Sequence, residues 1–463
     1  MKYISLFCAV MLTGFLSTLT AQNFPAPKSF GDVQNHGKNI QRTMRLLATS
    51  TPQKKNTVKI LFYGQSITEQ KWTQHVVEHL KNRFPHANLI TENRAIGGHS
   101  SQLLHKTAEA DLYPFYPDLV IFHVYGSHID YEKIIKGIRE KTTSEILIQT
   151  DHVTNPKDFE EITDRNKALP HVNWNSFMNY NFLPGVAQKY GAELCDQRTV
   201  WKQYLKDHKL KPSDLLKDAV HLNAHGEYLM GEIVNSWLRY DPKFKENSWQ
   251  KISDLKPVRK GNQIELSFEG NRIDIITAAK GSSVEVYIDG KRPSEIPELY
   301  QFSRTGYFPY MNWPCLLKVS SQKPLLEETW TASLTNVSND GKNFNFKIEG
   351  SKTGFDGEGH SSKAFVSNSG RVVIDPADWN VSYGMKVNPN GGKKLLDGSF
   401  KFTWKVLPMF KNSFSPEAPA AKNLEASTTI AQGLPNGKHR LILKGSGINT
   451  IKSIRVYNPS PVK

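Results

Sequence analysis

The sequence has few cysteines and no long apolar run beyond its first residues. Three cysteines occur in 463 residues, and Cys8 lies in the apolar leader described below. The other two, Cys195 and Cys315, fall in segments that we assign to different domains, and exported domains of this size build their own hydrophobic cores. We therefore expect no disulfide framework. Beyond the leader, no stretch is long and apolar enough to cross a bilayer, so no membrane span is predicted.

The first residues are typical of a cleavable secretory signal. Met1-Lys2-Tyr3 carries one positive charge, the apolar run 4–19 follows, and small residues precede Gln22. The run is too short and wrongly flanked for a membrane span. We place cleavage after Ala21 and expect an exported protein, periplasmic or secreted. Residues 22–56 are polar and aperiodic and are expected to form an N-terminal extension that wraps the first domain or remains partly ordered.

Acidic residues are the minority charge. Lysine and arginine number 59 against 44 aspartates and glutamates, which gives a formal charge of +15. Basic surfaces attract nucleic acid, anionic lipid or acidic polysaccharide. The lysines are scattered and no nucleic-acid-binding motif is present, so we expect no nucleic-acid partner. For an exported protein, an acidic polysaccharide is the favoured partner. The alternative is a solvated surface with no particular partner.

Residues 57–241 alternate strands with helices. Apolar, β-branched runs predict strands, and fourth-residue apolar spacing predicts helices. The strands are expected near 58–64, 87–91, 118–125, 145–150 and 192–196, and the helices include those near 72–84 and 224–240. Near-continuous apolar strands separated by helices indicate a parallel sheet covered on both faces.

Each of the first four strands is followed by polar residues or glycines: Ser66, Gly97-Gly98, residues 126–128 and Asp151-His152. The carboxyl ends of parallel strands lie along one edge, where ligands bind, so these loops are expected to converge. Ser66 follows Gly64 directly before a helix, where free backbone N–H groups favour developing negative charge. Alone, such a serine is more often a turn or cap residue.

A second signal lies just before the last helix of this region. Asp218 precedes His221 by three residues, so the carboxylate can accept the Nδ1 proton and leave Nε2 as a general base. An isolated pair of this spacing is common in solvated loops. Its combination with the Ser66 turn and the 93–98 loop, in this order, is much less common.

At this point the chain resembles the SGNH/GDSL hydrolases, over about residues 56 to 240. The family's Gly-Asp-Ser-Ile/Leu-Thr block is similar to residues 64–68 here, with Ser66 in the place of the nucleophile. Its second block is best matched by Asn93 and Gly98, and its Asp-x-x-His-x-x-x-x-Gly block by residues 218–226. The resemblance implies a flavodoxin-like three-layer α/β/α fold.

It also implies a site in which Ser66, Asp218 and His221 are catalytic. Gln65 stands where the family usually has Asp, as it does in relatives similar to sialate O-acetylesterases. His128 stands where the third block supplies an oxyanion Asn, and an imidazole N–H can also donate. The expected oxyanion hole is therefore Ser66, Gly98 and His128. No cofactor and no metal is expected.

The residues after Asp241-Pro242 read as all-β. Short alternating strands with Gly and Asn turns predict a β-sandwich or jelly roll over residues 242–463, in which the two end segments pair. Asn436-Gly437 predicts a tight turn between two strands. Residues of about 293–410 are expected to form a β-rich insertion or a third domain, rich in aromatics.

Core packing is the favoured role for most of these aromatics, and stacking on sugar rings is the alternative. They are Tyr300, Phe302, Tyr307, Phe308, Tyr310, Trp313, Trp330 and Trp379.

These features predict an exported serine esterase that removes acyl groups, acetyl above all, from a polysaccharide or oligosaccharide. An esterase domain joined to a β-sandwich resembles the layout of exported carbohydrate esterases. Two alternatives stay open. The changes at Gln65 and His128 fit a glycan-binding protein with a degenerate site, and transfer of the acyl group to another sugar is not separated from hydrolysis by sequence.

Overall fold

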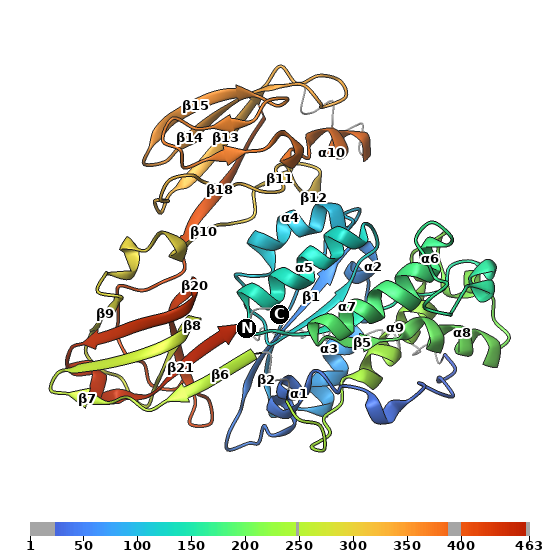
Figure 1. Ribbon diagram of the computed structural model, residues 1–463, viewed down its shortest axis with the longest axis horizontal. Helices are drawn as coiled ribbons and strands as arrows, with labels where there is room; N and C mark the ends of the chain where they lie inside the picture. Colours follow the sequence, from blue (N-terminus) through green and yellow to red (C-terminus); the bar gives the residue numbers. More distant parts are fainter. Residues whose placement is uncertain (1–23, 247–249, 388–399, 460–463) are drawn as a thin grey trace, which may run out of the picture.

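The computed structural model describes residues 24–246, 250–387 and 400–459 (Figure 1). The expected signal segment, residues 1–21, lies outside the described residues. The described chain forms an α/β body and a seven-stranded antiparallel sheet. A separate five-stranded sheet is built from residues inserted in the sequence between two strands of the seven-stranded sheet. Within the described ranges, no helix has the length and apolarity that crossing a membrane requires.

The α/β body has a five-stranded parallel sheet in the order β2-β1-β3-β4-β5, the flavodoxin-like order. Its strands are β1 Thr57–Gly64, β2 Asn88–Asn93, β3 Leu119–His123, β4 Glu145–Gln149 and β5 Glu193–Cys195. Its helices are α1 Gln41–Ala48, α2 Ser66–Glu69, α3 Trp72–Arg83, α4 Ser101–Asp111, α5 His128–Lys141, α6 Trp174–Ser176, α7 Leu183–Tyr190, α8 Gln197–Asp207 and α9 Ala224–Trp237. The predicted fold class is confirmed.

Alternation along the buried strands produces the three layers. Val58, Ile60 and Phe62 of β1 point into one apolar cluster, which α1, α3, α8 and α9 cover. Leu61 and Tyr63 point into the opposite cluster, which α4, α5 and α7 cover. Since both faces are covered, the strands are apolar throughout, as the sequence pattern indicated.

Part of the N-terminal extension is a helix that the sequence pattern missed. The carboxylate of Glu145 accepts hydrogen bonds from the N–H groups of Arg42 and Thr43 at 3.0 and 2.8 Å, at the start of α1. Glu145 is buried, and burial raises its pKa. Gln41 and Thr43 lie on the buried face of α1 and interrupt its apolar periodicity, which explains why this segment read as aperiodic.

The seven-stranded sheet joins the two ends of the C-terminal region, as predicted. Its strands are β6 Gln250–Leu255, β7 Arg259–Lys260, β8 Gln263–Thr277, β9 Val284–Ile288, β19 Ser413–Phe414, β20 Ala426–Lys444 and β21 Ile451–Pro459. The tight turn predicted at Asn436-Gly437 is wrong: both residues lie within β20. The register against β8 shifts between Gln432 and Gly437, so residues 433–436 form an irregularity in one long strand. Antiparallel sheets throughout residues 250–459 fit the predicted β-sandwich class.

The intervening residues build their own sheet and core. The five-stranded order is β10-β18-β13-β14-β15. The elements are β10 Tyr300–Phe302, β11 Tyr307–Phe308, β12 Met311–Pro314, β13 Thr329–Thr335, β14 Asn345–Gly350, β15 Gly354–His360, β16 Phe365–Val366, β17 Val373–Ile374, α10 Val381–Val387 and β18 Phe400–Pro408. Of the eight aromatics predicted to be mostly core residues, Phe308 and Trp330 are buried in this core and Tyr307 is exposed. The other five pack against the core: Tyr300, Phe302, Tyr310, Trp313 and Trp379.

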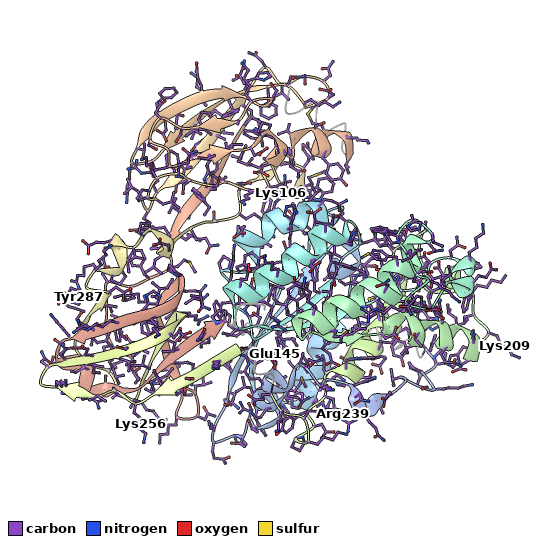
Figure 2. The ribbon with its side chains drawn as sticks, viewed as in Figure 1. Lys106, Glu145, Lys209, Arg239, Lys256 and Tyr287 are labelled. Carbon is purple, nitrogen blue, oxygen red and sulfur yellow. The ribbon has the colours of Figure 1, made fainter. Side chains whose placement is uncertain are left out.

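Polar contacts fix this inserted region, residues 293–410, against α4 of the α/β body (Figures 1 and 2). The Arg304 guanidinium donates to both carboxylate oxygens of Asp111, at 2.6 and 2.5 Å. Lys106 pairs with Asp378 at 2.8 Å. These contacts place β12 and α10 next to the carboxyl edge of the parallel sheet.

Candidate active site

The turn that carries Ser66 is shaped by close approach of the next strand. A Cβ on Gly64 would lie 2.1 Å from the His123 carbonyl oxygen and 2.3 Å from Thr68 Oγ1, so no larger residue fits. The Thr68 hydroxyl donates to that same carbonyl at 3.1 Å. The chain therefore leaves β1 tightly against β3, and Ser66 becomes the first residue of α2.

The structure brings Ser66, His221 and Asp218 into one hydrogen-bonded row. His221 Nε2 lies 2.9 Å from Ser66 Oγ, and His221 Nδ1 lies 2.8 Å from Asp218 Oδ2. Because the carboxylate can only accept, Nδ1 carries the proton and Nε2 is left to accept from the serine hydroxyl. These three residues have the geometry of an activated serine nucleophile.

Asp218 is held by its own loop and is still open to solvent. Its Oδ1 accepts the N–H groups of His221 and Val220 at 2.8 and 2.9 Å. These backbone hydrogen bonds, with the bond from the His221 ring, lower the pKa of Asp218 to about 2. The Asp218 side chain is 48% exposed and that of His221 is 31% exposed, so the row lies at an open edge.

Two residues outside the motifs hold the 218–222 loop. Gln70 donates from Nε2 to the Leu222 carbonyl at 2.8 Å and accepts the Leu222 N–H at 3.0 Å. His152 donates from Nε2 to the Val220 carbonyl at 2.8 Å, and burial lowers its pKa to about 4, so it is neutral at pH 7. The sequence placed His152 at a strand end but gave no signal for Gln70.

The 93–98 loop, which follows β2, contains one N–H group, that of Gly98, without a protein partner among the described residues. Ile96 N–H donates to the Gly64 carbonyl at 3.0 Å, and Gly97 N–H donates to Glu69 Oε1 at 2.8 Å. Among the described residues, neither the Ser66 N–H nor the Gly98 N–H donates to another protein group. Gly98 has a φ of +75°, a conformation that favours glycine.

Asn93, the other residue matched to the second block, supports the serine turn. Its side-chain amide donates to the Thr68 carbonyl at 2.7 Å, and its side-chain oxygen accepts the Ala95 N–H at 3.1 Å. Asn93 therefore ties the end of β2 to α2 and is not itself aimed at the reacting atoms.

His128 is the first residue of α5 and lies among three aromatic rings. Its ring meets those of Trp174, Phe177 and Phe182 at centroid distances of 5.5, 5.3 and 5.4 Å and interplanar angles of 62°, 89° and 81°. No contact between His128 and Ser66 or Gly98 is among those of the described residues. Its role as an oxyanion donor stays a prediction.

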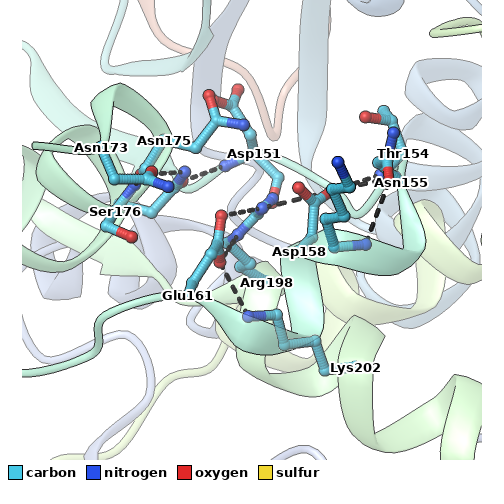
Figure 3. Close-up of polar contacts among 12 residues, drawn as sticks. Asp151, Thr154, Asn155, Asp158, Glu161, Asn173, Asn175, Ser176, Arg198 and Lys202 are labelled. Carbon is cyan, nitrogen blue, oxygen red and sulfur yellow. Dashed lines mark hydrogen bonds and ion pairs between the residues drawn. The ribbon is translucent and has the colours of Figure 1, made fainter.

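A buried polar network fixes the long connection between β4 and β5 beside the site (Figure 3). Arg198 donates to Glu161 Oε2 at 2.8 Å and to the His152 carbonyl at 2.8 Å. Asp151, the other polar residue after β4, faces His123 Nε2 at 3.2 Å, and its N–H donates to Asn179. The network thus anchors the backbone of His152, whose ring contacts the 218–222 loop.

No group of three or more His, Cys, Asp or Glu side chains suited to a metal occurs in the part of the chain that the structure describes. Cys195 and Cys315 are both buried and unbridged.

Comparisons with solved structures give matches that cover about 40% of this chain. No model of a protein family matches the chain, and no curated protein matches it. LAE5, an alpha/beta hydrolase enzyme from the metagenome of Lake Arreo in Spain, is 18% identical, with a TM-score of 0.32, over 39% of this chain and 94% of its own. Axe2, an acetylxylan esterase from Geobacillus stearothermophilus, is 17% identical, with a TM-score of 0.33, over 41% of this chain and 98% of its own.

A third match, described as a GDSL-like lipase from Parabacteroides merdae, is 16% identical, with a TM-score of 0.32, over 40% of this chain and 98% of its own. At such identities and TM-scores the likeness carries no information about the substrate of this chain.

Proposed function

We propose that the protein is an exported serine esterase of the SGNH kind that removes acyl groups, acetyl above all, from a polysaccharide or oligosaccharide. The observation that carries the proposal is the row Ser66, His221 and Asp218, with contacts of 2.9 and 2.8 Å. Ser66 is the proposed nucleophile, His221 the general base and acid, and Asp218 the residue that orients His221.

In the first half-reaction Ser66 Oγ attacks the ester carbonyl carbon while its proton passes to His221 Nε2. The tetrahedral intermediate collapses when His221 returns that proton to the leaving sugar oxygen, which gives an acyl-serine and a free sugar hydroxyl. In the second half-reaction His221 takes a proton from water, and the water oxygen attacks the acyl-serine. Collapse releases the carboxylic acid and restores the Ser66 hydroxyl.

The unpartnered N–H groups of Ser66 and Gly98 are the proposed main-chain donors to the oxyanion, and His128 is the candidate third donor. Such donors act on charge that develops in the transition state, and removing one typically costs about a hundred- to a thousandfold in rate. The chemistry proposed here is carried by the chain's own residues and needs neither metal nor cofactor.

A sugar polymer is the proposed substrate class because the reactive row lies at an open edge and not in a closed pocket. Gly98 and Asp218 are both exposed. A cavity of about 580 Å³ lies instead where the three bodies meet, and its lining does not include the three catalytic candidates. The charge of +15 favours a polyanionic glycan, and the leader-like residues 1–21 favour export.

The domain division that we propose follows the sheets. Residues 57–241 form the hydrolase-like domain, after the extension 22–56, and residues 242–463 form the β-sandwich region. The insertion at about 293–410 has its own sheet and its own apolar core.

The test is release of acetate from acetylated glycans and hydrolysis of p-nitrophenyl acetate by wild type and Ser66→Ala. Ser66→Ala is expected to fold normally and to lose turnover and labelling by a fluorophosphonate. Ser100→Ala is the matched control, because Ser100 lies at the same edge and its hydroxyl contacts neither His221 nor Asp218 among the described contacts. Turnover that is unchanged in Ser66→Ala excludes Ser66 from the mechanism.

The second candidate, a glycan-binding protein with a degenerate site, is favoured by the departures at Gln65 and His128. It predicts that wild type neither turns over esters nor reacts with the fluorophosphonate, yet binds a polyanionic glycan. Transfer of the acyl group to a second sugar is distinguished by identifying the acylated product when an acceptor sugar is present.

A further inference from the structure

Two aromatic side chains of the inserted region lie on the loop that carries Gly98. Trp313 comes from β12 and Tyr383 from α10, and Figure 1 shows both elements above the α/β body near α4. Their rings stack at a centroid distance of 4.8 Å and an interplanar angle of 19°. The edge of the buried His99 ring meets Trp313 at 5.0 Å. The aromatic pair therefore covers the Gly98 loop from outside the hydrolase-like domain.

Trp313 sets the space that is available at Gly98. A Cβ on Gly98 would lie 2.4 Å from Trp313 Cζ2, so the indole packs directly on the Cα of this residue. Trp313 also packs against the apolar clusters of both the α/β body and the inserted region. A change of the Gly98 backbone toward the indole is blocked because Trp313 is held from both sides.

Tyr383 fixes the peptide group on the far side of Gly98. Its hydroxyl donates to the Gly98 carbonyl oxygen at 2.8 Å. On the near side, Gly97 N–H is held by Glu69 at 2.8 Å. The Gly98 N–H lies between these two anchored groups and has no protein partner among the described residues. The Gly97 carbonyl, which belongs to the same peptide group as the Gly98 N–H, lies 3.4 Å from His99 Nδ1. The direction of the Gly98 N–H is therefore determined by contacts within the hydrolase-like domain together with one from the inserted region.

We propose that Tyr383 and Trp313 are positioning residues that hold Gly98 in the left-handed conformation in which its N–H meets the oxyanion. This inference rests on the proposed esterase function. Under this proposal the inserted region contributes to the geometry of the ester site. A preorganised donor costs no reorganisation during the reaction, whereas a mobile glycine peptide must be ordered each time.

The experiment measures kcat and KM for p-nitrophenyl acetate, a substrate too small to reach a remote glycan-binding surface. Rates are normalised to sites titrated with a fluorophosphonate, which removes any effect of misfolded protein. Tyr383→Phe deletes one hydroxyl from a side chain that is 37% exposed and should fold normally. We expect kcat to fall about three- to tenfold with KM unchanged, as for the loss of one hydrogen bond.

Trp313→Ala is expected to lower kcat further, toward the roughly hundredfold cost of a lost oxyanion donor. Trp313→Phe keeps a ring against Tyr383 and should recover part of that loss. The inhibition constant of a phenylboronic acid, whose tetrahedral adduct with Ser66 places an oxygen in the hole, should rise by the factor by which kcat/KM falls. Tyr287→Phe is the matched control, because it likewise deletes one hydroxyl with a single hydrogen bond, to Glu285 at 3.2 Å, and Tyr287 lies in β9 of the seven-stranded sheet. It should leave every parameter unchanged.

The outcomes separate the two proposals. If wild type neither hydrolyses the ester nor reacts with the fluorophosphonate, the esterase function fails and this inference fails with it. If wild type is active and Tyr383→Phe and Trp313→Ala keep full kcat per titrated site, the positioning role alone is overturned. If either variant raises KM with kcat and boronate affinity unchanged, the pair contacts substrate without positioning Gly98, which also overturns the proposal.

Discussion

The buried ion pair between Glu161 and Arg198 tests how the backbone at the end of β4, next to the site, is stabilised. Its side chain and that of Arg198 are each 2% exposed. Arg198 Nε donates to Glu161 Oε2 at 2.8 Å, and Lys202 Nζ donates to the same oxygen at 2.8 Å (Figure 3). Arg198 also donates to the carbonyls of Asp151 and His152. Removing the charge of Glu161 leaves a buried guanidinium undercompensated next to the end of β4.

The magnitude follows from that burial. Breaking a buried ion pair by removing one partner typically costs about 3 to 5 kcal/mol. Asp158 stays 3.3 Å from Arg198 and retains part of the compensation, so we expect Glu161→Gln to cost about 3 kcal/mol. For a domain of this size each kcal/mol lowers Tm by about 2 to 4 °C, which gives a fall of roughly 6 to 12 °C.

The assay is thermal and urea unfolding followed by tryptophan fluorescence, with Glu160→Gln as the control. Glu160 is the preceding residue and is exposed. The control substitution therefore removes the same charge from a side chain that has no contact with Arg198 among the described contacts. The reasoning is refuted if the two variants unfold at the same temperature and urea concentration.

Two further predictions concern the reacting groups. Because hydrogen bonds from backbone N–H groups lower the pKa of Asp218 from 3.8 to about 2, the carboxylate is ionised throughout the range in which esterases are assayed. Its stabilising effect is complete above pH 3.8 and is lost only as the pH falls toward about 2. The acid limb of kcat/KM above pH 4 should therefore belong to another group, and Asp218→Asn should lower kcat and still show such a limb; a variant in which the limb has disappeared contradicts this. If His128 donates to the oxyanion, His128→Asn should retain much of the esterase activity and His128→Ala should lose about a hundredfold or more. Equal, full activity in both variants would exclude His128 from the hole.

The strands, the serine turn and the Asp218–His221 pair were predictable because each is encoded locally. Apolar runs covered on both faces stand out in the sequence, and a histidine three residues after an aspartate can reach it within one turn. The contrast is Asn436-Gly437, a strong local turn signal that lies inside β20. There the pairing of residues 437–444 with β8 and of residues 441–444 with β9 outweighs the local preference.

The supports of the site were not predictable because their partners are distant in sequence. Gln70 acts on Leu222, 152 residues away, and Tyr383 acts on Gly98, 285 residues away. A glutamine after a short helix and a tyrosine in a β-rich insertion carry no pattern of their own. Their roles depend on which backbone groups the fold brings within hydrogen-bond distance.

This dependence explains why motif matching identifies a nucleophile more securely than an oxyanion hole. A nucleophile is a side chain, so its residue type is visible in the sequence. The donors proposed here are backbone N–H groups, which every residue but proline possesses. What distinguishes these two is that neither has a protein partner among the described residues. Glu69 takes the N–H of Gly97 and leaves that of Gly98, while Tyr383 takes the Gly98 carbonyl and leaves its N–H. Which N–H groups can donate to an oxyanion therefore depends as much on the hydrogen bonds that neighbouring groups already make as on the residue types that line the site.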